Sequence, residues 1–205
     1  MSNRLIDLIG INKSFDNTMV LDDLNLYIRE NEFLTLLGPS GCGKTTTLRI
    51  IGGFETPDSG KVLFSGEDIT SLPPNKRQLN TVFQKYALFP HMNIAENIAF
   101  GLKIKNKSKS YIDDKIKYAL KLVNLDGFED RMPDSLSGGQ QQRLALGKVL
   151  LTKPEILLLD EPTKGMDGSF KVKFGAMLGE LKKQGITTVL VSHDMEFCAE
   201  YATYC

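Results

Sequence analysis

The chain has 205 residues, 41% of them hydrophobic and 24% charged, which is enough apolar material for one sizeable core and a small subdomain. Lys plus Arg and Asp plus Glu each number 25, so the net charge is zero, which argues against nucleic acid as a partner. No apolar run reaches the length of a membrane span and the N-terminus lacks a signal-peptide segment, so we expect a cytoplasmic chain.

The first predicted elements are two half-exposed strands, over residues 5–11 and 20–28, where apolar and polar side chains alternate. A polar loop at residues 14–18 joins them, so we expect an antiparallel layer at the start of the fold. Phe15 falls in this loop. From the sequence alone it is either a plug in the core or an exposed ring.

A glycine-rich loop comes next, directly after an apolar run at residues 33–37 that predicts a buried strand. Its sequence GPSGCGKT fits G-x-x-x-x-G-K-[ST], in which the glycines let backbone N–H groups turn inward around a triphosphate. Lys44 can reach the β- and γ-phosphates, the Thr45 hydroxyl suits Mg²⁺, and the N-terminus of the following helix favours the same anion. An ordinary glycine-rich turn is the weaker interpretation in this strand-loop-helix context. The predicted nucleotide-binding residues here are Gly38, Ser40, Gly41, Cys42, Gly43, Lys44, Thr45 and Thr46.

Beyond the loop, a helix over residues 45–51 is expected to end at a Gly-Gly pair, followed by strands over residues 61–64 and 79–83. The second strand delivers Gln84 at its end. Residues 86–92 are unusually apolar for a loop, so they either pack on the core or form a surface for a partner.

The middle of the chain is predicted to be helical. Apolar residues at helical spacing indicate an amphipathic helix over residues 111–123. Before it, lysines at every second position indicate a solvated connection; these are Lys103, Lys105, Lys107 and Lys109. We therefore expect a helical subdomain at about residues 85–135, inserted between the two halves of an α/β core.

Two further motifs follow. LSGGQQQR, at residues 136–143, opens a predicted helix for which Ser137 is a suitable N-cap. Residues 156–159 are apolar without alternation, as expected of a parallel strand covered on both faces, and they end in Asp160 and Glu161.

These two adjacent carboxylates are either loop-capping acids or part of a reaction site. Because a phosphate loop lies in the same chain, we favour the second interpretation, in which Asp160 ligates Mg²⁺ and Glu161 orients and polarises the attacking water. A helix over residues 170–183 and a buried strand over residues 186–191 follow, and the strand carries His193 just past its end.

Four motifs thus occur in one order: the phosphate loop, Gln84, LSGGQQQR, and ILLLDEP followed by SHD. In their sequences and their order, these motifs resemble those of the nucleotide-binding subunit of ABC transporters. The resemblance extends from about Arg4 to the last residues. The resemblance implies a single domain, residues 1–205, with an α/β P-loop NTPase core whose mostly parallel sheet is flanked by helices. The antiparallel layer and the helical subdomain would be additions to this core, and the chain would bind ATP and Mg²⁺ and hydrolyse ATP.

The resemblance also implies roles for individual residues. Phe15 would stack on adenine, Gln84 would sense the γ-phosphate, Glu161 would be the general base and His193 would contact the γ-phosphate as a switch. The implied catalytic residues are Glu161, His193, Lys44 and Gln84. The implied Mg²⁺ ligands are Thr45, Gln84 and Asp160. The residues implied to contact ATP on the opposite protomer are Ser137, Gly138, Gly139 and Gln140.

Two partners are implied as well. One is a second copy of the chain, bound head to tail in the presence of ATP. The other is a membrane permease docking on residues 84–92, which would place the chain on the inner face of the cell membrane.

Within the family, the similarity differs along the chain. From Ile6 to about Arg143 the strings resemble ATPases of spermidine/putrescine importers and their iron, sulfate and sugar relatives. From Leu144 onward they are more similar to energy-coupling-factor ATPases for vitamin or metal uptake, and KGMD at residues 164–167 stands where the first group has an S-A-L-D type segment. The chain ends twelve residues after His193, so a truncated or minimal domain is expected.

The leading expectation is an ATPase that energises an importer for polyamines or a related small solute, with the energy-coupling-factor type as the alternative. A non-transport ABC ATPase acting on ribosomes or chromosomes would be expected to have tandem cassettes or a long coiled coil, and the chain has neither. A nucleotide-binding regulatory domain without turnover would be expected to lack Lys44, Glu161 or His193, and all three are present.

Overall fold

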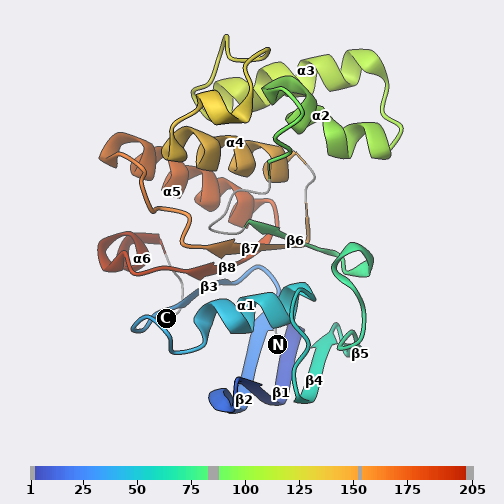
Figure 1. Ribbon diagram of the computed structural model, residues 1–205, viewed down its shortest axis with the longest axis vertical. Helices are drawn as coiled ribbons and strands as arrows, with labels where there is room; N and C mark the ends of the chain where they lie inside the picture. Colours follow the sequence, from blue (N-terminus) through green and yellow to red (C-terminus); the bar gives the residue numbers. More distant parts are fainter. Residues whose placement is uncertain (1–2, 83–87, 152–153, 202–205) are drawn as a thin grey trace. The chain divides into compact units, whose positions relative to one another are not determined.

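The computed structural model describes residues 3–82, 88–151 and 154–201 (Figure 1). The chain divides into two compact units. Unit 1 consists of Met1–Thr81, Glu155–Thr163 and Asp167–Cys205. Unit 2 consists of Val82–Pro154 and Lys164–Met166. Within the described ranges, no helix combines the length and the apolarity needed to cross a bilayer.

Unit 1 begins with an antiparallel sheet in the order β2-β1-β4-β5. Its strands are β1 (Arg4–Phe15), β2 (Thr18–Arg29), β4 (Ser59–Phe64) and β5 (Glu67–Asp68). The antiparallel layer predicted from the alternation is confirmed. The expectation that Phe15 lies in a loop is wrong, because Asp16 (φ 47°) and Asn17 (φ 61°) make a two-residue turn. Asp and Asn tolerate this left-handed conformation, so the strand continues to Phe15, which pairs with Thr18.

The second sheet of unit 1 has the order β3-β8-β7-β6. Its strands are β3 (Phe33–Leu36), β8 (Thr187–Val191), β7 (Ile156–Asp160) and β6 (Leu79–Val82). β7 and β8 are buried along their whole length and pair in parallel, as the unalternated apolar runs predict. Leu36 and Asp160 both pair with Val191, so three strands end together at one edge of the sheet.

Helix α1 (Lys44–Gly52) lies between the two sheets of unit 1 (Figure 1). Its apolar side chains share one core with both sheets; that core includes Ile6, Ile28, Leu48, Ile50, Ile51, Val62, Ile156 and Val189. α1 ends as predicted, since Gly53 adopts φ 76° as its C-cap. On the other face of the parallel sheet lie α5 (Gly168–Lys183), which contacts β8, and α6 (Met195–Tyr201), which contacts α5.

Unit 2 is built from helices. They are α2 (Ile94–Ile104), α3 (Lys109–Leu122) and α4 (Gly138–Leu150). α2 and α4 both contact α3, and a core that includes Ile98, Leu120 and Leu144 joins all three. The expectation of a solvated connection through four lysines is only partly correct, because Lys103 belongs to the last turn of α2 and Lys109 is the first residue of α3.

Candidate functional site

The candidate site of unit 1 lies at the edge where β3, β7 and β8 end. The phosphate loop follows β3, Asp160 is the last residue of β7, and His193 lies two residues beyond the end of β8. Ligands of open α/β sheets bind at the carboxyl ends of the strands. This edge therefore brings together the phosphate loop and the carboxylates that the sequence predicts to act with it.

Three glycines give the phosphate loop its shape. Gly38 (φ 150°), Gly41 (φ 84°) and Gly43 (φ 91°) all have positive φ, which side-chain-bearing residues rarely adopt. Gly43 also leaves no room for a side chain, since a Cβ there would lie 2.5 Å from Leu21 Cδ2 and 2.9 Å from the Val20 carbonyl. The tight loop thus depends on glycine both for its conformation and for its packing against β2.

Lys44 is the first residue of α1, and its side chain folds back over the loop. Its Nζ donates hydrogen bonds to the carbonyls of Gly38 and Pro39, both at 2.8 Å, and lies 3.4 Å from Cys42 Sγ. Only 9% of Lys44 is exposed. The ammonium is therefore held inside the curve of the loop, where it can meet phosphate oxygens.

Thr45 and Asp160 come together across the start of α1. The Thr45 hydroxyl donates to Asp160 Oδ1 at 3.0 Å, and Asp160 is 4% exposed. Burial raises the pKa of Asp160, while the hydrogen bond from Thr45 acts in the opposite direction. A hydroxyl and a buried carboxylate are hard oxygen ligands, so these two residues fit Mg²⁺ in the way the sequence predicts. Gln84, the third expected ligand, lies outside the described residues.

Glu161 and His193 also meet at this edge. His193 Nε2 lies 3.2 Å from Glu161 Oε1, and the backbone N–H of His193 donates to Glu161 Oε2 at 3.4 Å. The Glu161 backbone has φ 51° and donates its N–H to the carbonyl of Val191 at 2.8 Å. Such a conformation costs a non-glycine residue about 1–3 kcal/mol and tends to mark functional positions. The two residues predicted to serve the γ-phosphate are thus neighbours.

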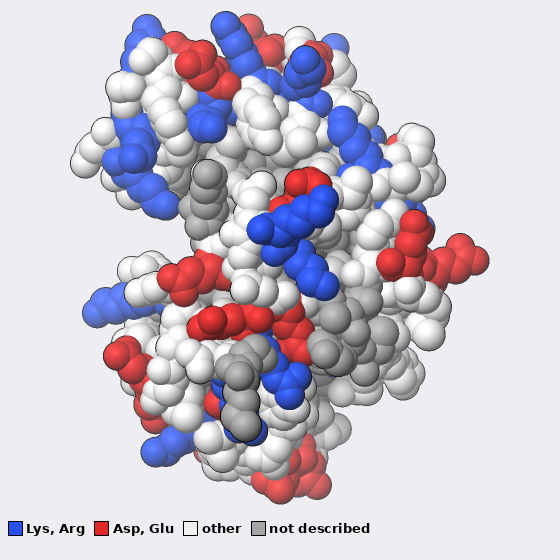
Figure 2. Space-filling view, turned by 180° about the vertical axis from the view of Figure 1, so that it is seen from behind, with Lys and Arg blue, Asp and Glu red and all other residues white. Residues whose placement is uncertain are grey.

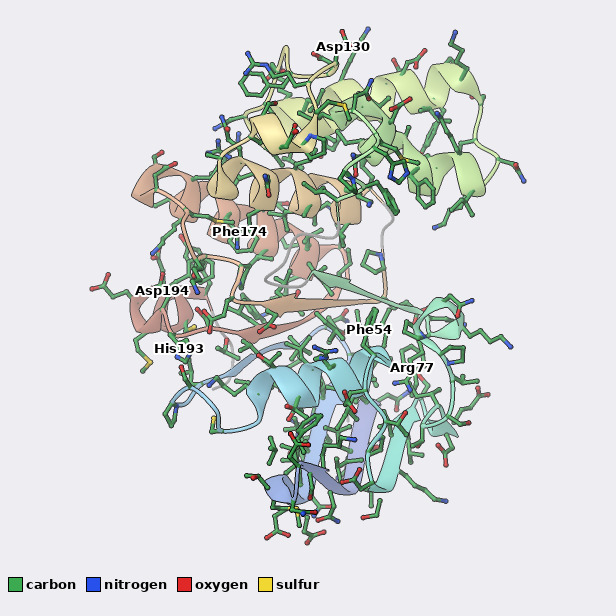
Figure 3. All side chains as sticks on the ribbon, in the orientation of Figure 1. Phe54, Arg77, Asp130, Phe174, His193 and Asp194 are labelled. Carbon is green, nitrogen blue, oxygen red and sulfur yellow. The ribbon has the colours of Figure 1, made fainter. Side chains whose placement is uncertain are left out.

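A support that the sequence does not reveal fixes the chain just after His193 (Figure 3). Asp194 accepts from the backbone N–H of Phe197 at 3.1 Å, and it forms an ion pair of 2.6 Å with Lys171 of α5. The hydrogen bond from Lys171 lowers the pKa of Asp194. SHD was visible as a motif, but nothing in the sequence points to Lys171 as its partner.

Phe15 lies at the tip of the β1–β2 hairpin and is 43% exposed. Of the two interpretations open from the sequence, the exposed ring is therefore correct. Lys13 Nζ lies 5.1 Å from the centroid of the ring. An exposed ring can stack on a planar ligand.

The LSGGQQQR motif belongs to unit 2, where Ser137 is the N-cap of α4 as predicted. Ser137 and Gln140 form a capping box: Gln140 Oε1 accepts from the Ser137 N–H at 2.9 Å, and Ser137 Oγ accepts from the Gln140 N–H at 3.4 Å. A Cβ on Gly139 would lie 2.7 Å from the carbonyl oxygen of Gly165, so glycine permits this close approach. Gly138 is the first residue of the helix, whose N-terminus suits an anion.

Comparison with known proteins decides the family. The model of the ABC transporter family matches residues 21–164, more than half of the chain. This chain belongs to the ABC transporter family. The ABC cassette fold expected from its motifs is confirmed, with the antiparallel sheet, the parallel sheet and the helices in the expected order.

Curated relatives of this cassette include two spermidine/putrescine import ATP-binding proteins. The one from Acetivibrio thermocellus is 58% identical over 195 residues, covering 95% of this chain and 55% of the relative. The one from Clostridioides difficile is 57% identical over 197 residues, covering 96% of this chain and 57% of the relative. The chain thus spans slightly more than half the length of these relatives, and the similarity extends into its C-terminal third.

Solved structures agree with this assignment. A bacterial ABC transporter cassette solved as a dimer has a TM-score of 0.89 and 32% identity, covering 98% of this chain and 94% of that chain. A dimeric cassette in a post-hydrolysis state, bound to ADP and phosphate, has a TM-score of 0.87 and 32% identity, with coverage of 94% and 90%.

Proposed function

We propose that this chain binds and hydrolyses ATP as the nucleotide-binding subunit of an ABC importer for polyamines. The observation that carries the ATPase assignment is the convergence of Lys44, Thr45, Asp160 and Glu161 on one edge of the parallel sheet in unit 1. The polyamine assignment rests on the names of relatives that are more than half identical to the chain.

In this proposal the phosphate loop and Lys44 bind the triphosphate. Backbone N–H groups of the loop and the N-terminus of α1 would bind the anion, and the Lys44 ammonium would exchange the carbonyls of Gly38 and Pro39 for phosphate oxygens. Two neutral hydrogen bonds are then replaced by charge-assisted ones, which are stronger. Thr45 and Asp160 would hold Mg²⁺, which supplies positive charge to the phosphates when bound.

Hydrolysis is assigned to Glu161 and His193. The Glu161 carboxylate accepts a proton from a water molecule while the water oxygen bonds to the γ-phosphorus, and the bond from that phosphorus to the bridging oxygen of ADP breaks. His193 Nε2 lies 3.2 Å from Glu161 Oε1, close enough to orient this carboxylate. We also assign His193 to the γ-phosphate as a hydrogen-bond donor. The products are ADP and inorganic phosphate, so atoms and charge balance.

We propose two partners, a second copy of the chain and a membrane permease. Ser137, Gly138, Gly139 and Gln140 open α4, and we assign their helix N-terminus to the ATP held by a second copy of the chain. The permease would dock on residues 84–92, of which residues 88–92 are described. Asn97 braces this segment with hydrogen bonds to the backbone of Phe89, Met92 and Asn93. The complex would hold the chain at the cytoplasmic face of the membrane.

Phosphate release by the purified chain tests the ATPase assignment. Lys44→Ala should lower the turnover of Mg-ATP by about 100-fold or more, because it removes a preorganised positive charge from the site. Lys183→Ala is the control, since Lys183 forms an exposed ion pair with Glu180. Equal rates for Lys44→Ala and the wild type would refute the site.

Uptake of labelled spermidine tests the substrate separately. Cells carrying the transporter with the wild-type chain should accumulate the label, and cells carrying Lys44→Ala should not. ATPase activity without any effect on spermidine uptake would leave the enzyme in place and refute the polyamine assignment.

A further inference from the structure

The hairpin that carries Phe15 extends beyond its support in the antiparallel sheet. The ladder between β1 and β4 ends at the pair Asn12–Ser59. β1 continues to Phe15 with β2 as its pairing partner, up to the pair Phe15–Thr18. An isolated two-stranded hairpin is only marginally stable, so the end of this one needs another attachment.

Hydrogen bonds to the segment after α1, most of them made by side chains, supply that attachment. Asp58 Oδ2 accepts the backbone N–H of Ser14 at 2.7 Å, and the Asp58 N–H donates to the carbonyl of Asn12 at 2.8 Å. Lys13 Nζ donates to the carbonyl of Thr56 at 2.9 Å and contacts Glu55 Oε1 at 2.9 Å and Asp58 Oδ1 at 3.1 Å.

The same ammonium faces the aromatic ring. Lys13 Nζ lies 5.1 Å from the Phe15 ring centroid, within the range of a cation–π contact. The Lys13 side chain is 12% exposed, whereas Phe15 is 43% exposed. Hydrogen bonding to Glu55 raises the pKa of Lys13, so the ammonium keeps its charge at physiological pH. The ring is thus anchored beside Lys13 and still offers surface to a ligand.

The attachment leads directly to the phosphate-binding helix. Glu55 and Asp58 lie in the segment after α1, and the Arg49 carbonyl near the end of α1 accepts the N–H groups of Phe54 and Glu55 at 2.9 and 3.3 Å. The N-terminus of α1 carries the phosphate loop. One helix therefore fixes the loop at its start and the aromatic ring, through Lys13, at its end.

We propose that Lys13, Glu55 and Asp58 are positioning residues that hold the Phe15 ring at a set distance from the phosphate loop, so that the base of a nucleoside triphosphate stacks on it. This inference rests on the proposed ATP site and adds the residues that determine the contribution of the base to affinity. The phosphates bind at the start of α1, so the network should leave their own binding unchanged.

Two ligands separate the contribution of the base to affinity from that of the phosphates. Calorimetry would measure Mg-ATP and inorganic tripolyphosphate with Mg²⁺, the second of which lacks the base. Lys13→Met should weaken ATP binding by roughly tenfold, through loss of the ring contact and of the hydrogen bonds that order the hairpin, and should change tripolyphosphate binding by less than about twofold. Lys13→Arg should retain most of the ATP affinity. Lys61→Met is the matched control, because Lys61 is 67% exposed and pairs with Asp68 at 3.9 Å in the same sheet.

A double-mutant cycle shows whether the network acts through the ring. Phe15→Ala should weaken ATP binding to a similar degree, and adding Lys13→Met to it should have little further effect. Asp58→Asn, which keeps the shape of the side chain, should also weaken ATP binding selectively.

Three results would overturn the inference: unchanged ATP affinity in Lys13→Met, an equal loss for ATP and tripolyphosphate, or full additivity with Phe15→Ala. A wild-type chain that binds tripolyphosphate but gains nothing from the base would also refute it and leave the phosphate site in place. A wild-type chain that binds neither ligand would refute the proposed function itself.

Discussion

Asp160, a proposed Mg²⁺ ligand, is a carboxylate whose burial costs stability. It is 4% exposed, and burial raises its pKa above the ordinary value of 3.8. A raised pKa in the folded state means that the protonated carboxyl is favoured by folding, so stability is lost as the pH rises through the interval above 3.8. A buried carboxylate of this kind is useful only when a cation accompanies it.

The first prediction concerns this pH dependence. In a chelator and without nucleotide, Asp160→Asn should raise the melting temperature at about pH 8 by roughly 2–4 °C, on the order of 1 kcal/mol, since it removes a charge that folding disfavours. The gain should shrink as the pH falls toward the ordinary value of 3.8, because the wild-type carboxyl takes up a proton. Thermal unfolding followed by circular dichroism measures it. A gain that is constant over this range would contradict the assigned cause.

Cys42 is a residue of the phosphate loop that a thiol reagent can modify. Cys42 is exposed and its Sγ lies 3.4 Å from Lys44 Nζ, whereas Cys198 is buried. A thiol reagent at Cys42 would place bulk in the proposed phosphate site, so it should inhibit ATP hydrolysis, and bound Mg-ATP should protect. Activity and mass spectrometry measure the two effects together.

The control for this second prediction is Cys42→Ser, which should keep activity within about twofold, because hydroxyl and thiol are of similar size. It should also resist the reagent. Full activity in a wild-type sample shown to be modified at Cys42 would rule the prediction out.

Among the elements, α1 depends on a buried arginine at its C-terminal end (Figure 3). Arg77 is 7% exposed and donates to the carbonyls of Ile50 and Ile51, both at 2.7 Å, and to that of Leu72 at 2.8 Å. Burial lowers the pKa of Arg77. Gly53 makes room, since a Cβ there would lie 2.6 Å from Arg77 Nε. The guanidinium thus satisfies carbonyls that a helix end leaves unpaired.

The third prediction follows from this cap. Arg77→Met should lower the free energy of unfolding by about 3 kcal/mol, because several buried carbonyls lose their donor, and the melting temperature should fall by roughly 6–12 °C. Arg77→Lys should not restore it, since an ammonium cannot reproduce the planar fork of donors. Arg4→Met, which removes an exposed ion pair with Asp7, should change stability by less than about 1 kcal/mol. A similar effect of Arg77→Met and Arg4→Met would contradict the capping role.

The sequence predicts those elements that are marked by a pattern within a few residues. The phosphate loop, the strand before Asp160 and the N-cap at Ser137 each carry a pattern within a few residues, and the structure has all three. α2 falls in the predicted helical subdomain but was not predicted as a separate helix, although Asn93 and Glu96 form a capping box with N-x-x-E spacing.

The sequence does not predict contacts between residues that lie far apart in the chain. Arg77 reaches Ile50 across 27 positions and Lys13 reaches Asp58 across 45, so no periodicity or motif connects either pair. The hairpin turn at Asp16 was missed for a different reason, since Asp-Asn is a weaker turn signal than Asn-Gly.

At the scale of the whole molecule, the charges are balanced and the motifs are divided between the two units. Positive and negative side chains lie among one another on the face in Figure 2, in keeping with the zero net charge. The phosphate loop belongs to unit 1 and the Ser137 helix N-terminus to unit 2. In the proposed head-to-tail dimer, each ATP would join unit 1 of one copy to unit 2 of the other, so ATP acts as a ligand of the closed dimer.

Glu161→Gln tests this central claim most directly. The amide keeps the size of the side chain but cannot accept the proton of the attacking water, so ATP should bind and remain intact. Size-exclusion chromatography with light scattering should then show a dimer with Mg-ATP and a monomer without it. Adding Ser137→Arg, which places bulk and charge at the helix N-terminus, should return the protein to a monomer. A Glu161→Gln chain that binds ATP yet stays monomeric at every concentration would contradict the proposed ATP-driven dimer.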